Sequence, residues 1–584
     1  MFELLINHQP YKMVVTSLTA LSLFIFFIYS FRLIFPKKHL SYPLILLGLS
    51  LLPLLSMFRK GVYESGDFTI HVTNTIAFYN SLSEGNIVPD WAGSLNAGYG
   101  YPAFVFIYPL PYYISSLFHL IGFSFINSVK LVLSVTFIGS GFAMYYWLKN
   151  HLPEKAAFLG AILYLFAPYH LIDLHFRSDV GEVAAFVFIP LSLLLIDKSL
   201  EYKAFFWKVL AGISIALLIL SHPAISLLAY PIILSYPLVR LKKLSFTPIV
   251  KAIIPSILGL LYSAYYWVPV LLEGKYTNQI REVNSILIYP TVSELLYSKW
   301  RYGLLFQGNG GELTYLLGYA HWIVILILLF IIFIKRRSNK FLVSLLLLFT
   351  VYLFLILDIS RPVWDAIPTL KKMQFPYRTL SILIFISSAA GAFIFKTVKL
   401  KYIYRLLIFV AIVTTLLNWG NRRMIENVDD DLIIQNLPMN AAQGGGVSAA
   451  APIWATTDSK LWMNTAAYNN LEILNGSVNI VAEERFNNSH GYLLNVKEKA
   501  VIKENTYYFP GWELRINGEK KEINYQNIQH PGLITFPLEK GYHFIELTFN
   551  NTPIRTLAKL LSAFSLFTSG LYLIFFSQNH LKTR

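Results

Sequence analysis

Residues 103–122 read AFVFIYPLPYYISSLFHLIG, and the predicted topology depends on how this stretch meets a membrane. It is apolar and long enough to span a bilayer, which takes about 20 residues of helix. However, Pro109 and Pro111 interrupt its helical pattern, and three tyrosines lie in its middle. These features are more typical of a segment that lies in the membrane interface than of a spanning helix.

Apolar runs continue on both sides of this stretch. Of the 584 residues, 55% are apolar and only 14% are charged, and the mean hydropathy is +0.53. A soluble domain is typically about one quarter charged, so this composition excludes an ordinary soluble enzyme. It also excludes a disordered chain, which needs the opposite bias. We therefore predict a multi-pass protein of the cell (plasma) membrane with at least one domain in water.

About thirteen runs are predicted to be transmembrane helices, because a span needs roughly 17–25 apolar residues and several of these runs approach that length. They are 13–35, 41–57, 127–148, 156–172, 183–197, 208–221, 224–239, 249–271, 313–334, 341–357, 379–395, 403–419 and 556–577.

The formal net charge of +16 comes largely from short Lys and Arg clusters between these runs. If residues 103–122 do not cross the bilayer, nearly all of these clusters fall on one side, together with Lys37 and Lys38. That is the pattern of the positive-inside rule, and it predicts an outer N-terminus and an inner C-terminus. Membrane insertion accounts for the charge, so we expect no nucleic-acid partner. The absence of cysteine excludes disulfides and thiolate chemistry.

The predicted outer segments are 58–125, 173–182, 272–312, 358–378 and 420–555. The last is polar and has alternating apolar runs beside turn signals such as Asn517-Gly518, which favours a small β-sandwich-like domain. The predicted fold class is an all-α polytopic membrane bundle with a C-terminal extracytoplasmic, mainly-β domain. The bundle covers residues 1–419, the β-rich domain 420–555, and the final transmembrane helix with a short cytoplasmic tail 556–584.

Two groups of polar residues in the first outer segment could bind or react with a substrate. Asp67 and His71 share one face if a helix begins near Asp67. Spacing alone favours a simpler interpretation, with Asp67 as a helix N-cap and His71 as an interfacial aromatic. Tyr99 and Tyr101 lie in a Gly- and Tyr-rich turn, which could be a floor for a sugar or a membrane-surface anchor.

The second outer segment, 173–182, holds five ionisable residues in ten positions. Asp179 and Glu182 lie at the start of the next helix, where acids complement the helix dipole. That role does not explain Arg177, which lies on the side that usually lacks positive charge. Arg177 and His175 could hold a phosphate.

Three more cations, Lys371, Lys372 and Arg378, break the orientation rule on the same side. They could meet lipid headgroups non-specifically or bind one lipid phosphate. For Ser221-His222-Pro223, a capped helix end before proline is the favoured interpretation. The sequence shows no strong metal motif, no P-loop that would support ATP-driven transport, and no serine nucleophile elbow.

The order of these motifs resembles GT-C-fold membrane glycosyltransferases. More closely, it resembles the prokaryotic membrane proteins related to YfhO and those described as 6-pyruvoyl-tetrahydropterin synthase-related. Ser178 departs from the pattern of this group, which usually has a glycine directly after the arginine that corresponds to Arg177. No three-histidine zinc site of the soluble pterin synthases is readable. The resemblance runs from about residue 60 to the end, and its motifs are Gly66-Asp67 with His71, Pro89-Asp90-Trp91, Gly98–Pro102, Arg177 with Glu182, Gln374–Arg378 and Tyr508–Trp512.

The resemblance implies a GT-C-like bundle that transfers a sugar from a polyprenyl-phosphate-linked donor to a glycan, lipid or protein acceptor on the outer face. By position, Asp67 would be the general base for the acceptor hydroxyl. Arg177 and Arg378, with Lys372 as a third candidate, would stabilise the departing phosphate.

Asp179 and Glu182 have several possible roles in that scheme. They would orient His175 or Arg177, bind the acceptor, or hold a divalent cation (Mg²⁺ or Mn²⁺) together with Asp67. We expect Asp67, Arg177, Glu182 and Arg378 to converge at one site. Two alternatives stay open, a non-enzymatic transporter of lipid-linked glycans and an envelope assembly factor. Polar clusters at the outer edge, rather than in mid-span, favour an interfacial enzyme.

Overall fold

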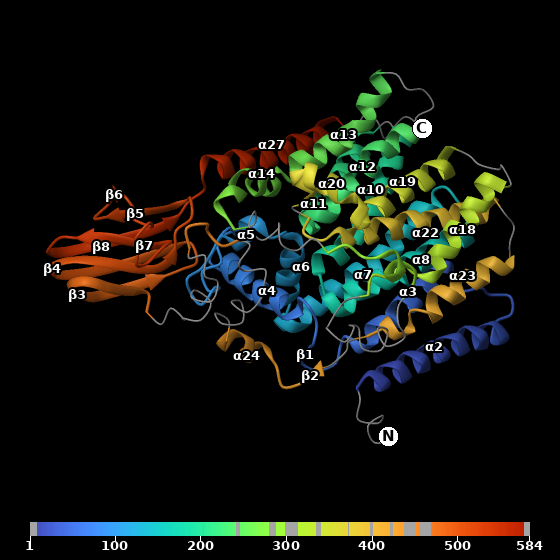
Figure 1. Cartoon of the computed structure of the whole chain (residues 1–584), viewed down its shortest axis with the longest axis horizontal. Coiled ribbons are helices and arrows are strands. Elements are labelled where there is room, and N and C mark those ends of the chain that lie inside the picture. Colours follow the sequence, from blue (N-terminus) through green and yellow to red (C-terminus); the bar gives the residue numbers. More distant parts are fainter. Residues whose placement is uncertain are drawn as a thin grey trace.

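The structure is a computed structural model of the chain. It describes residues 9–202, 204–240, 246–278, 288–297, 314–334, 340–371, 373–397, 401–420, 424–436, 450–455 and 469–576. Most of these residues form helices, and a β-sheet from the C-terminal part of the chain lies at one end of the molecule (Figure 1).

Long apolar helices make up the body of the molecule. Within the described ranges, six are long and apolar enough to cross a membrane, three bent helix pairs would also qualify, and shorter apolar helices accompany them. These helices coincide with the predicted spans, although crossing by about thirteen of them stays a prediction. They are α2 (Gln9–Ile34), α3 (Tyr42–Leu51), α7 (Phe125–Lys149), α8 (Glu154–Leu165), α9 (Pro168–Ile172), α10 (Val180–Glu201), α11 (Phe205–Ser221), α12 (Pro223–Arg240), α13 (Phe246–Tyr262), α14 (Ala264–Glu273), α18 (Tyr319–Leu329), α19 (Lys340–Ile356), α22 (Thr379–Thr397), α23 (Lys401–Val413) and α27 (Pro553–Phe576).

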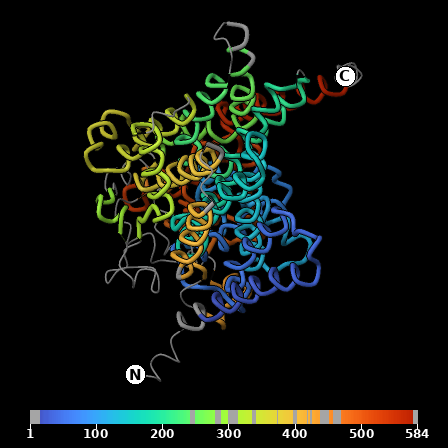
Figure 2. The backbone as a smooth tube through the Cα atoms, turned by 90° about the vertical axis from the view of Figure 1, so that its right-hand side faces the viewer, coloured from blue at the N-terminus to red at the C-terminus, as the bar shows by residue number. Residues whose placement is uncertain are grey.

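The helices gather around a common core. In Figure 2 the N-terminal segments, in blue, lie at the lower right and the yellow segments at the upper left. Helix α10 contacts α7 and α11 extensively, and α22 packs on α8. Small residues let α8 and α22 approach each other closely. A Cβ on Gly160 of α8 would lie 3.1 Å from the Cβ of Ala392 of α22. Residues 173–182, the second polar loop, lead into α10, the helix that packs against both α7 and α11.

Residues 103–122 do not form one straight helix. They form α5 (Ala103–Phe106) and α6 (Leu110–Leu120), and Pro109 precedes α6. Pro111 lies in the first turn of α6, where the missing N–H of a proline has no intrahelical partner to lose. With a rise of about 1.5 Å per residue, neither piece is long enough to cross a bilayer. The break therefore lies where the sequence predicted it.

The C-terminal sheet is antiparallel throughout. Its path is β3-β4-β8-β5-β6, and β7 pairs with the second half of β4. All six strands lie in one hydrogen-bonded sheet, whereas the sequence predicted a sandwich-like arrangement. The predicted turn at Asn517-Gly518 is correct, because both residues have positive φ (53° and 83°) between two paired strands. The strands are β3 (Leu471–Arg485), β4 (Ser489–Tyr507), β5 (Trp512–Ile516), β6 (Glu519–Lys521), β7 (Leu533–Leu538) and β8 (Gly541–Phe549).

The sheet is docked on the first polar loop, residues 58–102, near α4 (Phe68–Ser83) and α5 (Figure 1). The rings of Trp91 and Trp512 meet edge to face at 5.2 Å. The carboxylate of Glu84 accepts hydrogen bonds from the backbone N–H and side-chain amide of Asn487, at 2.8 and 2.7 Å. The loop between α4 and α5 therefore joins the sheet to the helices.

The chain between the last bundle helix and the sheet packs on the helical part. The short strand β2 (Met424–Ile425) pairs with β1 (Val62–Tyr63), which leads directly to Asp67. Asp430, the first residue of α24 (Asp430–Gln435), accepts hydrogen bonds from the backbone N–H groups of Phe125 and Ile126 at the start of α7. This segment, which we assigned to the β-rich domain, thus holds the first polar loop in place.

Candidate functional site

The second polar loop changes helix type before it turns. After α9 the chain forms a π-helical turn, η2 (Asp173–Arg177), and Ser178 then adopts the left-handed conformation with φ of 55°. Asp179 caps α10, because its Oδ1 accepts hydrogen bonds from the backbone N–H groups of Gly181 and Glu182. The cap explains the position of Asp179, as expected for an acid at a helix N-terminus.

Arg177 is surrounded by carboxylates. Its guanidinium lies 2.6 Å from Asp173, 3.1 Å from Asp179 and 2.9 Å from Glu182, and it also donates to the hydroxyl of Tyr169. The guanidinium is almost fully buried. The arginine that the sequence assigned to a phosphate is therefore already paired with protein acids.

Arg378 joins this cluster from a distant part of the chain. It ends the turn η6 (Pro376–Arg378) at the start of α22, and its Nε donates to Glu182 Oε1 at 2.6 Å. One of its terminal nitrogens donates to the backbone carbonyl of Met373, and the other lies 3.9 Å from Asp179. Glu182 itself is fully buried, so it binds both arginines and does not reach the surface.

Asp67 approaches the same cluster through its backbone. The N–H groups of Gly66 and Asp67 donate to the carbonyls of Phe176 and Arg177, at 2.7 and 2.8 Å. Asp67 precedes α4, but its side chain makes no capping bond, and Ser65 accepts the hydrogen bond from the Phe68 N–H instead. The structure thus brings Asp67, Arg177, Glu182 and Arg378 together at one end of the bundle.

The Asp67 carboxylate differs from the other acids of the cluster. It is only half-buried, and within the described part of the chain it has no hydrogen-bond partner. Burial, together with the negative charge of Asp179, raises the pKa of Asp67 to about 6, although Arg177 and Arg378 act in the opposite direction. An acid with a raised pKa and a free carboxylate is suited to accept a proton near neutral pH.

His71 lies one helical turn after Asp67, but its ring faces other residues. Its Nδ1 is 2.9 Å from the hydroxyl of Tyr112. Burial lowers the pKa of His71 to about 4, so the imidazole is neutral at pH 7. Next to it, Tyr108 donates a hydrogen bond to Asp179 Oδ1 at 3.0 Å. The structure therefore connects His71 to Tyr112 of α6 and to Tyr108, which precedes α6, and its predicted catalytic role stays a prediction.

Other predicted site residues lie apart from the charged cluster. His175 is buried against Phe176 and faces the backbone of Pro53. The ring of Tyr99 packs on Tyr507 of β4, and Tyr101 is buried with its backbone bridged to Ala92. Their substrate-binding roles stay predictions. Lys372 lies outside the described residues, and its neighbour Lys371 pairs with Asp365.

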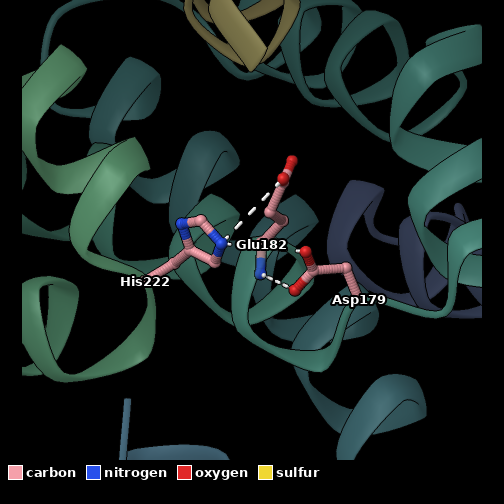
Figure 3. A group of neighbouring side chains, drawn as sticks. All are labelled: Asp179, Glu182 and His222. Atoms are coloured by element: carbon pink, nitrogen blue, oxygen red, sulfur yellow. Dashed lines mark hydrogen bonds and ion pairs between the residues drawn. The ribbon is translucent and has the colours of Figure 1, made fainter. Parts of the chain in front are cut away.

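His222 is a residue of the cluster that the sequence did not predict, since a capped helix end is the favoured interpretation of Ser221-His222-Pro223. Its Nε2 lies 3.7 Å from Asp179 Oδ2 and 4.0 Å from Glu182 Oε1, and the three side chains point toward one another (Figure 3). The available signal was weak, since His222 is one histidine at the same predicted end of the bundle as residues 173–182. Tyr108 donates to Asp179 and Tyr169 donates to Glu182. Tyr169 lies in the segment Ala167-Pro168-Tyr169, which is part of the resemblance, but neither tyrosine is among the predicted site residues.

The donor atoms of Asp179, Glu182 and His222 lie within 4.8 Å of one another, a spacing that a metal ion could use. However, Glu182 Oε1 already faces both arginines, and Asp179 Oδ2 faces Arg177. A divalent ion would have to compete with two fixed guanidinium charges for these oxygens. The arrangement fits arginines rather than a resident ion, and the expected Mg²⁺ or Mn²⁺ stays a prediction.

Comparison with known proteins identifies the family of this chain. A family model described as "6-pyruvoyl-tetrahydropterin synthase related domain; membrane protein" matches residues 104–422, just over half of the chain. The chain belongs to this membrane-protein family. The match includes Arg177, Glu182, His222 and Arg378, whereas Asp67 precedes it.

One curated relative of the chain is an uncharacterised protein of Lactococcus lactis subsp. cremoris (strain MG1363). It is 24% identical over 249 residues, which are 41% of this chain and 40% of that protein. The chain therefore matches well under two thirds of that relative's length.

Among solved structures, arabinofuranosyltransferase AftD from Mycobacteria aligns with 65% of this chain and 27% of its own, at 14% identity and a TM-score of 0.43. The Archaeoglobus fulgidus oligosaccharyltransferase in its apo form aligns with 65% and 55%, at 15% identity and a TM-score of 0.41. The oligosaccharyltransferase AglB of the same organism, in complex with an inhibitory peptide and a dolichol-phosphate, aligns with 69% and 60%, at 15% identity and a TM-score of 0.41.

Proposed function

We propose that this family member is a membrane glycosyltransferase. It would move a sugar from a polyprenyl-phosphate-linked donor to a glycan, lipid or protein acceptor on the outer membrane face. The observation that supports this proposal best is the half-buried Asp67 carboxylate. In the described structure it has no hydrogen-bond partner, and it lies in the field of two fixed arginines.

Asp67 would act as the general base. As the acceptor oxygen forms its bond to the anomeric carbon of the sugar, the hydroxyl proton passes to the Asp67 carboxylate. The bond between that carbon and the phosphate oxygen breaks, and its electron pair leaves with the phosphate. A phosphate departs without a proton, so one base is sufficient, whereas a glycosidase needs two carboxylates because its leaving group is an alcohol.

Arg177 and Arg378 would stabilise the negative charge that develops on the phosphate. Their ion pairs with Asp173, Asp179 and Glu182 fix the guanidinium groups before the substrate arrives. Preorganised charges of this kind need no rearrangement at the moment of reaction. In this scheme Glu182 is a positioning residue, because it is fully buried and cannot touch a substrate.

The dense pairing of Arg177 also favours a second candidate function. An envelope assembly factor, or a transporter of lipid-linked glycans, would keep such a cluster only to hold its loops together. A buried ion-pair network is compatible with that structural role. Asp67 distinguishes the two candidate functions. Its carboxylate makes no hydrogen bond to another loop in the described structure, so a purely structural role does not explain it.

The test compares Asp67→Asn with Glu64→Gln in purified protein reconstituted in lipid vesicles. Glu64 is an exposed acid in the same loop and serves as the matched control. Radiolabelled sugars on a polyprenyl phosphate are the donors, and release of the free lipid phosphate measures turnover. Loss of a general base typically costs about 10²–10⁴-fold in rate.

We expect Asp67→Asn to lose turnover by that factor while it still binds a polyprenyl phosphate without sugar. Glu64→Gln should behave like the wild type. Full turnover by Asp67→Asn would contradict the assignment of the base. A wild-type protein that binds no polyprenyl phosphate would contradict the proposed function itself.

A further inference from the structure

The position of His222 fixes which of its ring nitrogens carries the proton. His222 lies between α11 and α12, and its carbonyl accepts the first helical hydrogen bond from the Ser226 N–H. Its Nδ1 accepts a hydrogen bond from the Ile225 N–H at 3.3 Å, which is the geometry of an N-cap. A ring nitrogen that accepts from a backbone N–H carries no proton itself. In the neutral imidazole the proton therefore lies on Nε2.

The Nε2–H of His222 points into the charged cluster. Asp179 Oδ2 and Glu182 Oε1 lie 3.7 and 4.0 Å away, beyond ordinary hydrogen-bond distance. Figure 3 shows the ring facing these two carboxylates. Nε2 makes no hydrogen bond to any residue that the structure describes, and Asp179 Oδ2, at 3.7 Å, is the nearer of the two carboxylate oxygens. His222 is buried apart from 4% of its surface, and its Nε2–H is a donor that no described residue uses.

The charges around His222 restrict what it can bind. Asp179, Glu182, Arg177, Arg378 and the hydroxyl of Tyr108 are the charged and titratable groups that face it. Burial lowers the pKa of His222 to about 4, so it brings no positive charge at neutral pH. A phosphate oxygen only accepts hydrogen bonds, and at this position it would lie against two carboxylates.

A hydroxyl group fits this position better than an anion does. It can accept a hydrogen bond from His222 Nε2–H and donate its own proton to Asp179 Oδ2 at the same time. Asp179 Oδ2 accepts a hydrogen bond from Arg177 and has room for a second donor, whereas Oδ1 already accepts from Tyr108, Gly181 and Glu182. Nε2 and Oδ2 are 3.7 Å apart, close enough for one hydroxyl oxygen that lies beside them, not between them, to reach both.

An aromatic ring lies beside this polar pair. The ring of Tyr108 is 5.1 Å from the ring of His222, and it is only half-buried. Gly181 lets Tyr108 come this close, because a Cβ at residue 181 would lie 2.5 Å from two atoms of the tyrosine ring. An apolar face next to directional donors and acceptors is the usual composition of a pocket for a small polar ligand.

We propose that His222 Nε2–H and Asp179 Oδ2 together bind one hydroxyl of the transferred sugar, with Tyr108 against the sugar ring. This inference rests on the proposed glycosyl transfer and names the part of the site that recognises the sugar. It makes His222 a specificity-determining residue. It also replaces Tyr99 and Tyr101, which pack elsewhere, as the predicted aromatic surface for the sugar.

Two variants separate the donor from the helix cap. His222→Asn keeps a good N-cap acceptor for the Ile225 N–H but is too short to place a donor where Nε2 lies. His222→Gln places an amide N–H near the Nε2 position. The full-length proteins are purified in detergent. Their affinities are measured for a polyprenyl phosphate without sugar and for the same lipid carrying glucose, galactose or mannose.

We expect the wild type to bind one of the sugar-carrying lipids about tenfold more tightly than the bare lipid, as one well-placed hydrogen bond allows. His222→Asn should lose this preference and keep its affinity for the bare lipid. His222→Gln should recover part of the preference. Deletion of the recognised hydroxyl from the sugar should weaken binding to the wild type but not to His222→Asn.

Four outcomes would overturn the inference. A wild type that binds the bare lipid without any preference for a sugar would leave His222 without a hydroxyl to recognise, although the phosphate site would stand. Equal loss of affinity for bare and sugar-carrying lipids in His222→Asn would indicate phosphate binding or a structural role. A nitrogen NMR spectrum that placed the neutral His222 proton on Nδ1 would refute the donor assignment without any ligand. Failure to bind every lipid would refute the proposed function as well.

Discussion

Glu182 Oε1 accepts a hydrogen bond from Arg378 Nε at 2.6 Å, although the two residues are 196 positions apart in the sequence. The same oxygen lies 2.9 Å from Arg177. The guanidinium groups of Arg177 and Arg378 repel each other. The buried carboxylate that both of them contact offsets that repulsion. Glu182 therefore links the second polar loop to the start of α22.

Removal of this carboxylate should destabilise the protein strongly. Glu182→Ala leaves two buried positive charges without their shared partner, and breaking a buried ion pair costs about 3–5 kcal/mol. Glu201 near the other end of α10 is the matched control, because its pair with Lys198 is half-exposed. Glu201→Ala should cost no more than about 1 kcal/mol.

Both variants are unfolded in detergent by heat or denaturant, and the free energies of unfolding are compared with that of the wild type. Equal losses in Glu182→Ala and Glu201→Ala would mean that the buried cluster contributes no more than a surface pair.

Turnover should depend on the ionisation of Asp67. Its pKa of about 6 lies above the ordinary value of 3.8, because burial and Asp179 disfavour the charged form. The base works only when it is ionised, so kcat/KM should fall as the pH drops below about 6. The profile of kcat/KM between about pH 5 and pH 8 is the measurement, and a flat profile would contradict the assignment.

Stability should respond to the same group in the opposite direction. The folded protein holds the Asp67 proton more tightly than the unfolded chain does, because its pKa is raised on folding. This contribution to stability is present at pH values below 3.8 and is lost as the pH rises through about 6. Asp67→Asn removes the titrating group, so the difference in melting temperature between variant and wild type should change across that interval.

Much of the helical arrangement follows from local sequence patterns. Apolar runs identified the helices, and the prolines at 109 and 111 identified the break in residues 103–122. The cap at Asp179 follows from the preference for acids at a helix N-terminus. The grouping of Asp67, Arg177 and Arg378 was expected from the order of the motifs, and no local rule could place them together.

Other features depend on tertiary contacts that leave little trace in the sequence. The π-helical turn at 173–177 changes the direction of the side chains around it, so His175 faces Pro53 while Arg177 faces Glu182. Tyr99 could as well face a sugar as another protein ring, and it meets Tyr507 because the sheet docks there. A strand pattern likewise predicts strands but not whether they close into one sheet or two.

Ser178 offers a test of backbone conformation beside the cluster. Its φ of 55° lies in the left-handed region, which glycine adopts without strain and which the resembling proteins usually supply with glycine. Ser178→Gly should therefore be neutral or should stabilise the protein by up to about 1 kcal/mol. Ser178→Val should destabilise it, because a β-branched residue is a severe outlier there. Thermal unfolding of the two variants and the wild type measures these effects. A Ser178→Val variant more stable than the wild type would contradict the left-handed conformation of residue 178.

Gly181 tests whether Tyr108 must lie close to the start of α10. In Gly181→Ala the new Cβ would be 2.5 Å from the Tyr108 ring and 2.6 Å from the backbone carbonyl of Ser221, and the backbone cannot simply rotate away. We expect a loss of about 1–3 kcal/mol in unfolding free energy from this overpacking. Turnover should fall as well, because the hydrogen bond from Tyr108 to Asp179 is displaced.

Gly139 of α7 is the control for the effect of alanine in a helix. A Cβ there would make only ordinary contacts with Val187, at 3.5 and 3.7 Å. Gly139→Ala should therefore be neutral or stabilising by about 0.5–1 kcal/mol, since alanine is the better helix former. If both alanine variants were equally stable and active, Tyr108 would not need its close approach to α10, and its place against a sugar ring would lose its structural basis.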